Sequence, residues 1–415
     1  NDSTDLIDQS KAGLFPVASD LELYELNVIP KNIKEKEESA KKIAEIIGEK
    51  QEDIFTKINN SKPYLPPLKK RLSKETADKI ASLKLKGVFL TGQYSRFYPE
   101  KEFLSQVLGF VDFDGNGKYG IEGFYDGLLK GEGGTVTGVK DNLGRVIKIK
   151  QSEPGKSGAD IVLTIDRSIQ YMAEKKLKEG IDRYGAEGGS IIIMDPSTGG
   201  ILAMSSLPNF DPNKFNEVNK DNQSVFINPA TGQNWEPGSI FKPLVVAGAI
   251  QNNLVQPDSK PSPEEGGFSN SITVDGYEIH NAMDKPYGFE TVTQILENSD
   301  NIGMVWIANK LGNEPLSKFI QSLGFGLKSG IDIAGESPGQ VRPARTWKDV
   351  NRATISFGQG ISVTPIQIIQ AYGVIANKGK LVKPHLLDRV VLPSGEDEKF
   401  KNQELVEIVS PETAK

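Results

Sequence analysis

The sequence predicts a two-domain α+β protein, and three observations lead to that fold class. A chain of 415 residues is long enough for two or three domains, and 37% hydrophobic content with 8% aromatics is ordinary for a globular protein. Strand-like alternating stretches and helical apolar stretches are interspersed in both halves. A polar stretch over 145–156, with a proline followed by a glycine, predicts a linker. We therefore expect domains over residues 1–155 and 156–415.

Composition argues against several classes of function. The net charge of −6 comes from 49 basic and 55 acidic residues without a long basic block, so no nucleic-acid partner is expected. Cysteine is absent and His280 and His385 are the only histidines, which leaves little material for a metal site or a Ser-His-Asp triad. No cofactor or metal is therefore expected.

The two ends of the chain and its hydropathy predict that it is an internal piece of a longer protein. No run approaches the roughly eighteen apolar residues of a membrane span. The chain begins at Asn1 without an initiator Met or a signal segment. At the other end, Ser410 is the expected N-cap of a helix that is not completed at Lys415.

The first domain is expected to contain small α+β elements. Residues 21–28 alternate like a half-exposed strand, and an amphipathic helix follows over 35–47, ended by Gly48. The remaining expected elements are a helix over 68–83 with Ser73 as its N-cap, a strand over 87–92 and a short helix over 100–108.

An acidic, glycine-rich stretch over 112–123 allows three interpretations. Asp112, Asp114 and Asn116 match the opening of a calcium-binding loop, but Gly123 stands where that loop needs its closing glutamate. Its glycines also spell G-x-G-x-x-G, yet no buried strand precedes them, as a phosphate-binding turn requires. We therefore favour a turn rich in Gly, Asn and Asp that leads into a helix.

The second domain is expected to combine apolar strands with helices. A strand over 159–165 and a helix over 167–179 precede a hairpin of 190–195 and 200–205, whose apolar runs indicate a sheet covered on both faces. The later expected elements are a polar loop over 209–233, helices over 292–296, 302–311, 314–323 and 366–376, and strands over 381–382 and 386–392 that continue the sheet.

The stretch over 235–243 holds the first candidate for chemistry. A Pro-Gly turn delivers Ser239 to the start of an apolar helix, where unpaired N–H groups and the helix dipole favour negative charge. Lys242 follows one turn later on the same face. The pair has the parts of a serine nucleophile and a lysine base. Taken alone, S-x-x-K is more often an ordinary Ser N-cap followed by a surface lysine.

The second candidate is a polar break between two apolar helices. Ser299, Asp300 and Asn301 lie on a loop that a rigid core would hold in position, and loops of that kind carry function. The same residue types also suit an ordinary N-cap for the second helix.

Together, the two motifs resemble those of the penicillin-recognising serine enzymes, with S-x-x-K over 239–242 followed by S-D-N over 299–301. The chain is similar to the class B penicillin-binding proteins over nearly its whole length, because further stretches occur in that family's order. These stretches are Arg-Phe-Tyr-Pro over 96–99, Gly-Ile-Glu-Gly-Phe-Tyr-Asp over 120–126, Met-Asp-Pro-Ser-Thr-Gly-Gly-Ile-Leu-Ala-Met over 194–204 and Phe-Gly-Gln-Gly-Ile-Ser-Val-Thr-Pro over 357–365. The family's K-T-G motif and its membrane helix are not in the sequence.

The resemblance implies an elongated N-terminal pedestal or dimerisation-type domain. A transpeptidase domain would follow, with an antiparallel sheet covered by helices and an α-helical subdomain, cut short at its C-terminus. The implied location is the extracytoplasmic face of the bacterial plasma membrane, to which the full-length protein would be anchored. The implied partners are peptidoglycan stem peptides, β-lactams, a membrane glycan synthase and proteins of cell elongation or division.

The resemblance also implies a reaction, peptidoglycan D,D-transpeptidation. Ser239 would attack the penultimate D-Ala carbonyl of a stem peptide, and an amine of a neighbouring stem peptide would resolve the acyl-enzyme. Lys242 would deprotonate Ser239, Ser299 would relay the proton to the leaving amine, and Asn301 would bind the substrate backbone. Weak acylation is expected of the chain as given, since K-T-G is missing.

Two alternatives share these residues. A serine β-lactamase would need a base to activate the deacylating water, and Glu336 is the candidate, although the accompanying Asn is absent. A non-catalytic β-lactam-sensing or interaction protein of the same fold is the other alternative.

Overall fold

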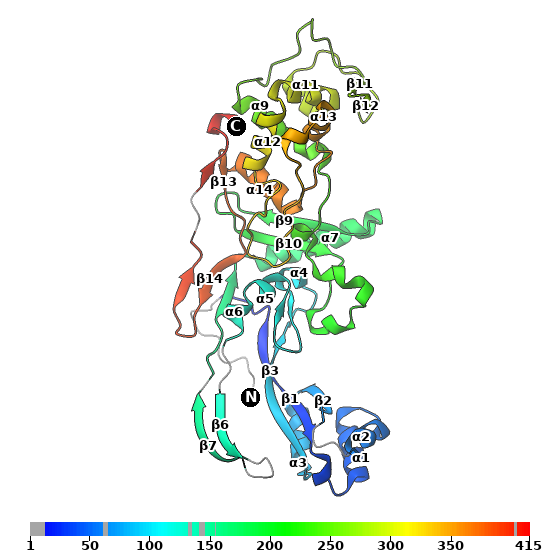
Figure 1. Cartoon of the computed structure of the whole chain (residues 1–415), viewed down its shortest axis with the longest axis vertical. Helices are drawn as coiled ribbons and strands as arrows, with labels where there is room; N and C mark the ends of the chain where they lie inside the picture. The colour runs from blue at the N-terminus through cyan, green and yellow to red at the C-terminus, as the bar shows by residue number, and fades with distance from the viewer. Residues whose placement is uncertain (1–12, 61–64, 132–134, 141–145, 154, 402–404) are drawn as a thin grey trace. The chain divides into compact units, whose positions relative to one another are not determined.

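The chain folds into two compact units, Asn1–Lys101 and Glu102–Lys415 (Figure 1). The computed structural model describes residues 13–60, 65–131, 135–140, 146–153, 155–401 and 405–415. Helices and strands are mixed in both units, in agreement with the expected α+β class.

The first unit is built on a three-stranded antiparallel sheet. Its strand order is β2-β1-β3, with bounds Lys69–Leu72, Ser19–Val28 and Val88–Phe97. Three helices bury their apolar faces in one core with Leu26 of β1. These helices are α1 (Lys36–Ile47), α2 (Gln51–Ile58) and α3 (Lys74–Ser82), and a 3-10 turn, η2 (Pro30–Asn32), precedes them.

Local sequence signals located most of this unit correctly. The strand over 21–28 and the helix ended by Gly48 are confirmed, and Gly48 adopts a left-handed φ of 68°. The helix expected over 68–83 is wrong in its first part. Residues 69–72 pair with β1, and Arg71 has a φ of 61°, which no helix accepts. The N-cap is confirmed, because the Ser73 side chain accepts the Thr76 N–H at 3.2 Å.

The second unit opens with short elements around the glycine-rich stretch. They are α4 (Ser105–Leu108), β4 (Phe110–Val111), β5 (Gly117–Lys118), α5 (Gly120–Phe124) and α6 (Asp126–Leu129). The favoured turn is confirmed, since Asp112 Oδ1 accepts the N–H groups of Asp114 at 3.0 Å and Asn116 at 2.9 Å. The helix expected over 100–108 shrinks to its last four residues.

The linker expected over 145–156 is wrong for most of its length. Residues Val146–Glu153 form β7, which pairs antiparallel with β6 (Thr135–Lys140). The alternating Val-Ile-Lys-Ile-Lys run that starts at Val146 favours a strand. Strand pairing therefore determines the structure here, although the polar composition predicted a linker.

The strands of the second unit form several small sheets rather than one. β9 (Gly189–Met194) and β10 (Ile201–Leu207) form the predicted hairpin, which contacts α7 (Arg167–Tyr184) and α14 (Pro365–Ala376). The expectation that the late strands continue this sheet is wrong. β14 (Leu387–Val391) pairs with β8 (Asp160–Leu163) and β15 (Asp397–Lys399), and β13 (Lys380–Leu381) pairs with β16 (Val406–Glu407).

A buried carboxylate explains where β14 is held. Asp332 accepts the N–H groups of Leu386 at 2.6 Å and Leu387 at 2.8 Å, and the Tyr125 hydroxyl donates to it at 2.9 Å. Three segments far apart in the sequence are thereby joined at one point, which periodicity alone does not reveal.

The helices of the second unit surround one large apolar core. Helix α9 (Lys242–Gln251) is buried on nearly every side, as its apolar sequence predicts, and it lies beside α11 (Asn301–Leu311) (Figure 1). The expected helices over 292–296 and 314–323 are confirmed as α10 (Val292–Glu297) and α12 (Asn313–Ser322). The remaining helices are η3 (Pro212–Glu217), η4 (Lys220–Phe226), α8 (Pro229–Gly232), η5 (Gly238–Phe241), η6 (Ala344–Thr346), α13 (Asp349–Ser356) and α15 (Pro411–Ala414).

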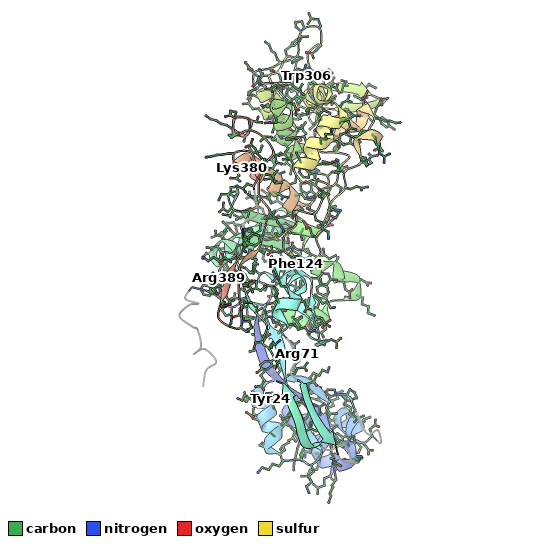
Figure 2. The ribbon with its side chains drawn as sticks, turned by 60° about the vertical axis from the view of Figure 1, so that its left-hand side comes forward. Tyr24, Arg71, Phe124, Trp306, Lys380 and Arg389 are labelled. Carbon is green, nitrogen blue, oxygen red and sulfur yellow. The ribbon has the colours of Figure 1, made fainter. Side chains whose placement is uncertain are left out.

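The segment between α9 and α10 contains a hairpin that the sequence reading missed. Strands β11 (Ser271–Val274) and β12 (Tyr277–His280) are antiparallel, and an Asp-Gly turn with positive φ at both residues joins them. The same segment is fastened to α11 at Glu265, whose Oε1 accepts from Trp306 Nε1 and Lys310 Nζ, each at 3.0 Å. Figure 2 labels Trp306 on that helix.

Among the residues that the structure describes, no helix has both the length and the apolar character that a bilayer crossing requires.

Candidate active site

Ser239 lies in a tight turn immediately before a buried helix. Gly238 has a left-handed φ of 60°, the 3-10 turn η5 follows, and Pro243 occupies the first turn of α9. The Ser239 carbonyl accepts the Lys242 N–H, while the Ser239 side chain is exposed. The fold therefore presents a serine hydroxyl to solvent at the N-terminus of a core helix, as the sequence predicts.

A second backbone segment fixes the position of this turn. The Gly238 N–H donates to the Gly358 carbonyl at 3.0 Å, and Trp235 and Val363 exchange two backbone hydrogen bonds. A Cβ on Gly358 would overlap the backbone oxygen of Gly238 and lie 2.6 Å from its nitrogen. The Tyr372 hydroxyl also donates to the Ile240 carbonyl at 2.7 Å. The glycine-rich stretch over 357–365 is thus a support for the Ser239 turn.

Lys242 points from α9 to the polar break between α10 and α11. Its Nζ donates to the Ser299 carbonyl at 2.6 Å and contacts Ser299 Oγ at 2.9 Å. The lysine is only 1% exposed. The structure therefore joins the two motifs that the sequence analysis singled out, directly and away from bulk water.

The protonation of Lys242 is set by burial. An ammonium group has three N–H donors, and the two contacts with Ser299 occupy two of its positions. Burial lowers the pKa of Lys242 from 10.5 to about 8, while the charge of Asp300 opposes that shift. When the amine is neutral, the position not used by Ser299 is a lone pair that can accept a proton.

Two buried acids lie around the same turn. Asp300 is fully buried, and its Oδ1 accepts the Ile302 N–H at 2.7 Å as the N-cap of α11. Glu290 is 7% exposed and accepts a hydrogen bond from the Asn298 side chain. Desolvation raises the pKa of both carboxyl groups, and the charge of Asp300 raises the pKa of Glu290 further.

Ser299 and Asn301 are held in a particular geometry. Ser299 has a φ of 54°, which is unfavourable for any residue with a Cβ and is found mostly at turns and functional sites. Asn301 starts α11, and its side-chain Nδ2 donates to the His280 carbonyl at 2.8 Å. The predicted residues therefore lie at the starts of two neighbouring helices, Ser239 and Lys242 at α9 and Ser299 and Asn301 at α11. Lys242 and Ser299 are in direct contact.

Sequence reasoning missed the residues that hold the second motif. Asn281 and Glu290 contact the turn from the stretch between α9 and α10, for which no element was predicted. The Asp-Gly pair at 275–276, flanked by alternating residues, was a signal that could have located the hairpin. No comparable signal marks Asn281 or Glu290, since their contacts depend on tertiary structure.

Glu336, the alternative base, is engaged elsewhere. Its carboxylate accepts the Ser329 N–H at 2.6 Å, the Ser329 hydroxyl at 2.5 Å and the Gly330 N–H at 3.3 Å. Over the residues that the structure describes, no group of three His, Cys, Asp or Glu side chains could hold a metal ion.

Two known protein families match the chain. The penicillin binding protein transpeptidase domain matches residues 189–415, and the penicillin-binding protein dimerisation domain matches residues 13–163. The fold and these matches define a penicillin-binding protein.

Individual relatives narrow that class. The chain is 33% identical to stage V sporulation protein D of Bacillus subtilis over 94% of its own length and 60% of that protein. It is 30% identical to the peptidoglycan D,D-transpeptidase FtsI of Escherichia coli over 85% of its length and 58% of that protein. It thus spans about 60% of these curated relatives. Penicillin binding protein 3 of Mycobacterium tuberculosis, solved with aztreonam, has a TM-score of 0.67 and 29% identity, covering 78% of this chain and 67% of that one.

The chain belongs to the class B penicillin-binding proteins. The resemblance inferred from the sequence is thereby confirmed, and so is the expected order of a dimerisation-type domain followed by a transpeptidase domain.

Proposed function

We propose that the protein is a peptidoglycan D,D-transpeptidase that acts through an acyl-enzyme on Ser239 and is inhibited by β-lactams. The observation that carries the proposal concerns Lys242, which lies one turn after the exposed Ser239. Lys242 is buried, and its Nζ contacts Ser299. The relative from Escherichia coli bears the name of that activity. The homologous protein of Mycobacterium tuberculosis has been solved with aztreonam and with ampicillin, which supports β-lactam binding here.

In the proposed first step, Ser239 Oγ attacks the carbonyl of the penultimate D-Ala and its proton passes to the neutral amine of Lys242. The Oγ–C bond forms, and the tetrahedral oxyanion lies near the N-terminus of α9, where the Ser239 N–H is a donor. Ser299 Oγ, in contact with Lys242, then relays the proton to the leaving nitrogen as the amide C–N bond breaks. Asn301 binds the substrate backbone.

In the proposed second step, the amine of a neighbouring stem peptide attacks the acyl-enzyme. Its proton returns to Ser239 through the same lysine and serine as the ester bond breaks. The cross-link replaces the peptide bond that was cleaved, and the enzyme is regenerated. No external oxidant or cofactor is needed.

The β-lactamase alternative is less favoured by the structure. A deacylating base must reach a water at the acyl-enzyme, whereas both carboxylate oxygens of Glu336 accept hydrogen bonds from residues 329–330. A non-catalytic sensor would share the acylation step, so only turnover of a stem-peptide substrate separates it from a transpeptidase.

We propose that residues 1–155 form the non-catalytic domain and residues 156–415 belong to the catalytic domain. The dimerisation-domain match over 13–163 supports a boundary near that point. In line with the family, we place the full-length protein on the outer face of the plasma membrane, with a glycan synthase and elongation or division proteins as partners.

The test is acylation of the full-length protein by a fluorescent penicillin. Wild type should be labelled covalently, Ser239→Ala should not be labelled, and Lys242→Met should be labelled at least a hundredfold more slowly, about the size of a general-base effect. Equal labelling of wild type and Ser239→Ala would overturn the assignment. Cross-linking of a stem-peptide donor to an amine acceptor then separates a transpeptidase from a sensor.

A further inference from the structure

Residues 277–290, here named the β12 segment, contact the Ser299 turn at several points. Asn281 lies just after β12 and is 4% exposed. Its Oδ1 accepts the backbone N–H of Asn301 at 2.8 Å and that of Ile302 at 3.4 Å. Asn281 thereby satisfies the Asn301 N–H, one of the donors that a helix start leaves unpaired, whereas the Ile302 N–H also donates to Asp300 at 2.7 Å.

The amide of Asn281 is itself anchored on both sides. Its Nδ2 donates to the Lys285 carbonyl at 3.0 Å and to the Ser269 carbonyl at 3.4 Å. A buried amide with its oxygen and its nitrogen both engaged has one favoured orientation. Asn281 therefore fixes the distance between the hairpin and the first residue of α11.

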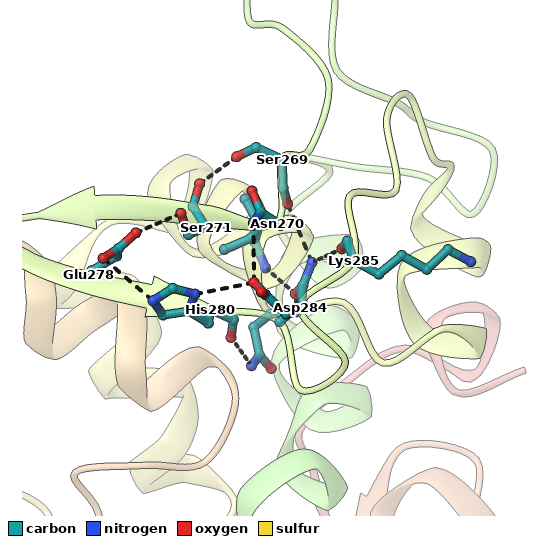
Figure 3. A network of polar contacts seen from close by, with 10 residues as sticks. Ser269, Asn270, Ser271, Glu278, His280, Asp284 and Lys285 are labelled. Atoms are coloured by element: carbon teal, nitrogen blue, oxygen red, sulfur yellow. Dashed lines mark hydrogen bonds and ion pairs between the residues drawn. The ribbon is translucent and has the colours of Figure 1, made fainter.

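The side chain of Asn301 is oriented by the same segment. Its Nδ2 donates to the His280 carbonyl at 2.8 Å, and Figure 3 shows this carbonyl on the hairpin, beside the polar contacts that link His280 with Glu278 and Asp284. An amide has two N–H donors and one oxygen acceptor. One N–H and the oxygen remain for a substrate, which suits the N–H and C=O of a peptide backbone.

The β12 segment also forms hydrogen bonds with Asn298, the residue before Ser299. The Asn298 side chain donates to Glu290, and the Tyr287 hydroxyl donates to the Asn298 carbonyl at 3.4 Å. The turn includes Ser299, whose φ of 54° is strained and persists only when surrounding contacts impose it. The β12 segment supplies such contacts before and after Ser299.

We propose that the β12 segment positions the side-chain amide of Asn301 for the substrate. Asn281 does so by holding the backbone at the start of α11. The proposal rests on the proposed function, because it assigns Asn301 a bound substrate. Asn281 is a positioning residue rather than a catalytic one, since it acts through Asn301 and α11.

The test is a double-mutant cycle on the second-order rate of acylation by a fluorescent penicillin, using the full-length protein. Asn281→Ala should slow acylation about tenfold, the size expected when one well-placed hydrogen bond is lost. In an Asn301→Ala background the same change should alter the rate by less than about twofold, because the residue through which it acts is gone. An equal loss in both backgrounds would overturn the proposal, as would no loss in the wild-type background.

The matched control is Asn270→Ala. Asn270 is an exposed asparagine beside the same hairpin, and its side chain donates to Asp284 at 3.1 Å without contacting the turn. Acylation by this variant should stay within about twofold of wild type, since only a surface contact is removed. A slowing equal to that of Asn281→Ala would show a general effect of the hairpin and would contradict the role given to Asn281.

A second readout does not depend on catalysis. Native-state hydrogen exchange should be faster at the backbone amide of Asn301 in Asn281→Ala, and unchanged in Asn270→Ala. Unchanged exchange at that amide in Asn281→Ala would overturn the positioning role even if acylation slowed. Failure of the proposed function would appear separately, as equal labelling of wild type and Ser239→Ala.

Discussion

Lys242 Nζ contacts both oxygens of Ser299, at 2.6 Å for the carbonyl and 2.9 Å for Oγ, although the two residues lie 57 positions apart in the chain. Because the carbonyl can only accept, one N–H of the lysine is permanently engaged there. The backbone of the second motif therefore orients the amine, which also contacts the hydroxyl of that motif.

The first prediction concerns the pH dependence of acylation. In the proposed mechanism the neutral amine of Lys242 is the active form. The pKa of Lys242 is lowered to about 8, so only about a tenth of the molecules carry the neutral amine at pH 7. The second-order rate should rise with pH and level off above a midpoint near pH 8. Stopped-flow labelling between pH 6 and 10 measures it, and a flat profile over that range would contradict the assignment of the base.

The second prediction concerns Asp300→Asn. The charge of Asp300 raises the pKa of Lys242, so its removal should move the midpoint of the acylation profile to lower pH. Asn also caps helices well, so α11 should keep its N-cap. Glu297→Gln, an exposed acid at the end of α10, is the control and should leave the midpoint in place. A midpoint that moves upward in Asp300→Asn would refute this account of the electrostatics.

The third prediction compares two glycines of one loop. Gly358 and Gly360 have nearly equal φ values of 77° and 76°, but only Gly358 abuts the backbone of Gly238. Gly360→Ala should cost about 1 kcal/mol of stability, because its positive φ strains the backbone and its Cβ would lie only 3.3 Å from Thr354 Oγ1. Gly358→Ala must also displace the Ser239 turn, and acylation should fall by about a hundredfold. Thermal unfolding measures the stability of both variants, and labelling measures their acylation rates. Equal effects of the two variants would contradict the role given to the close contact between Gly358 and Gly238.

The fourth prediction separates the backbone of Ser299 from its hydroxyl. Ser299→Gly relieves the strain at φ 54° and should be about 1 kcal/mol more stable than Ser299→Ala, which keeps the Cβ. Both lack Oγ, so both should be acylated about a hundredfold more slowly than wild type. Denaturant unfolding measures the stabilities. If Ala proves as stable as Gly, the turn is not strained in the protein.

The fifth prediction concerns the stability effect of burying Lys242. Its pKa is lowered from 10.5 to about 8, so the folded state disfavours the ammonium form. The unfolded chain then binds more protons between pH 8 and 10.5, and wild-type stability rises with pH through that window. Lys242→Met lacks this effect. It should gain up to about 3 kcal/mol relative to wild type at pH 7, less whatever the lost hydrogen bonds contribute.

The measurement for that variant is the difference in unfolding free energy at pH 7 and at pH 10.5. The advantage of Lys242→Met over wild type should shrink as pH rises, whatever its size at pH 7. A difference that is constant with pH would mean that the lysine is not destabilised by burial.

Local signals in the sequence were sufficient for the elements that carry the first motif. Pro243 and the apolar run after it placed Ser239 at the start of a buried helix, and Ser73 and Ser410 marked N-caps that the structure confirms. Such signals act over one helical turn, so they can be recognised without knowledge of the fold.

Two of the errors share a physical cause, which is contact between residues distant in the sequence. β14 was expected to continue the sheet of β9 and β10. It pairs instead with β8, and Asp332 holds its start by accepting two backbone N–H groups. Likewise, the support given by Asn281 to Asn301 depends on contacts across 20 positions. Periodicity reports which face of an element is buried but not which partner covers it.

The His280 carbonyl holds the Asn301 side chain, and this bond uses the main chain only. Any residue at position 280 offers the same oxygen, so the amino acid there can be substituted during evolution without loss of this hydrogen bond. An alignment of related sequences would then show a variable column at a place where the geometry is invariant. For this hairpin, sequence variability is a poor guide to importance, and comparison of backbone positions is the better one.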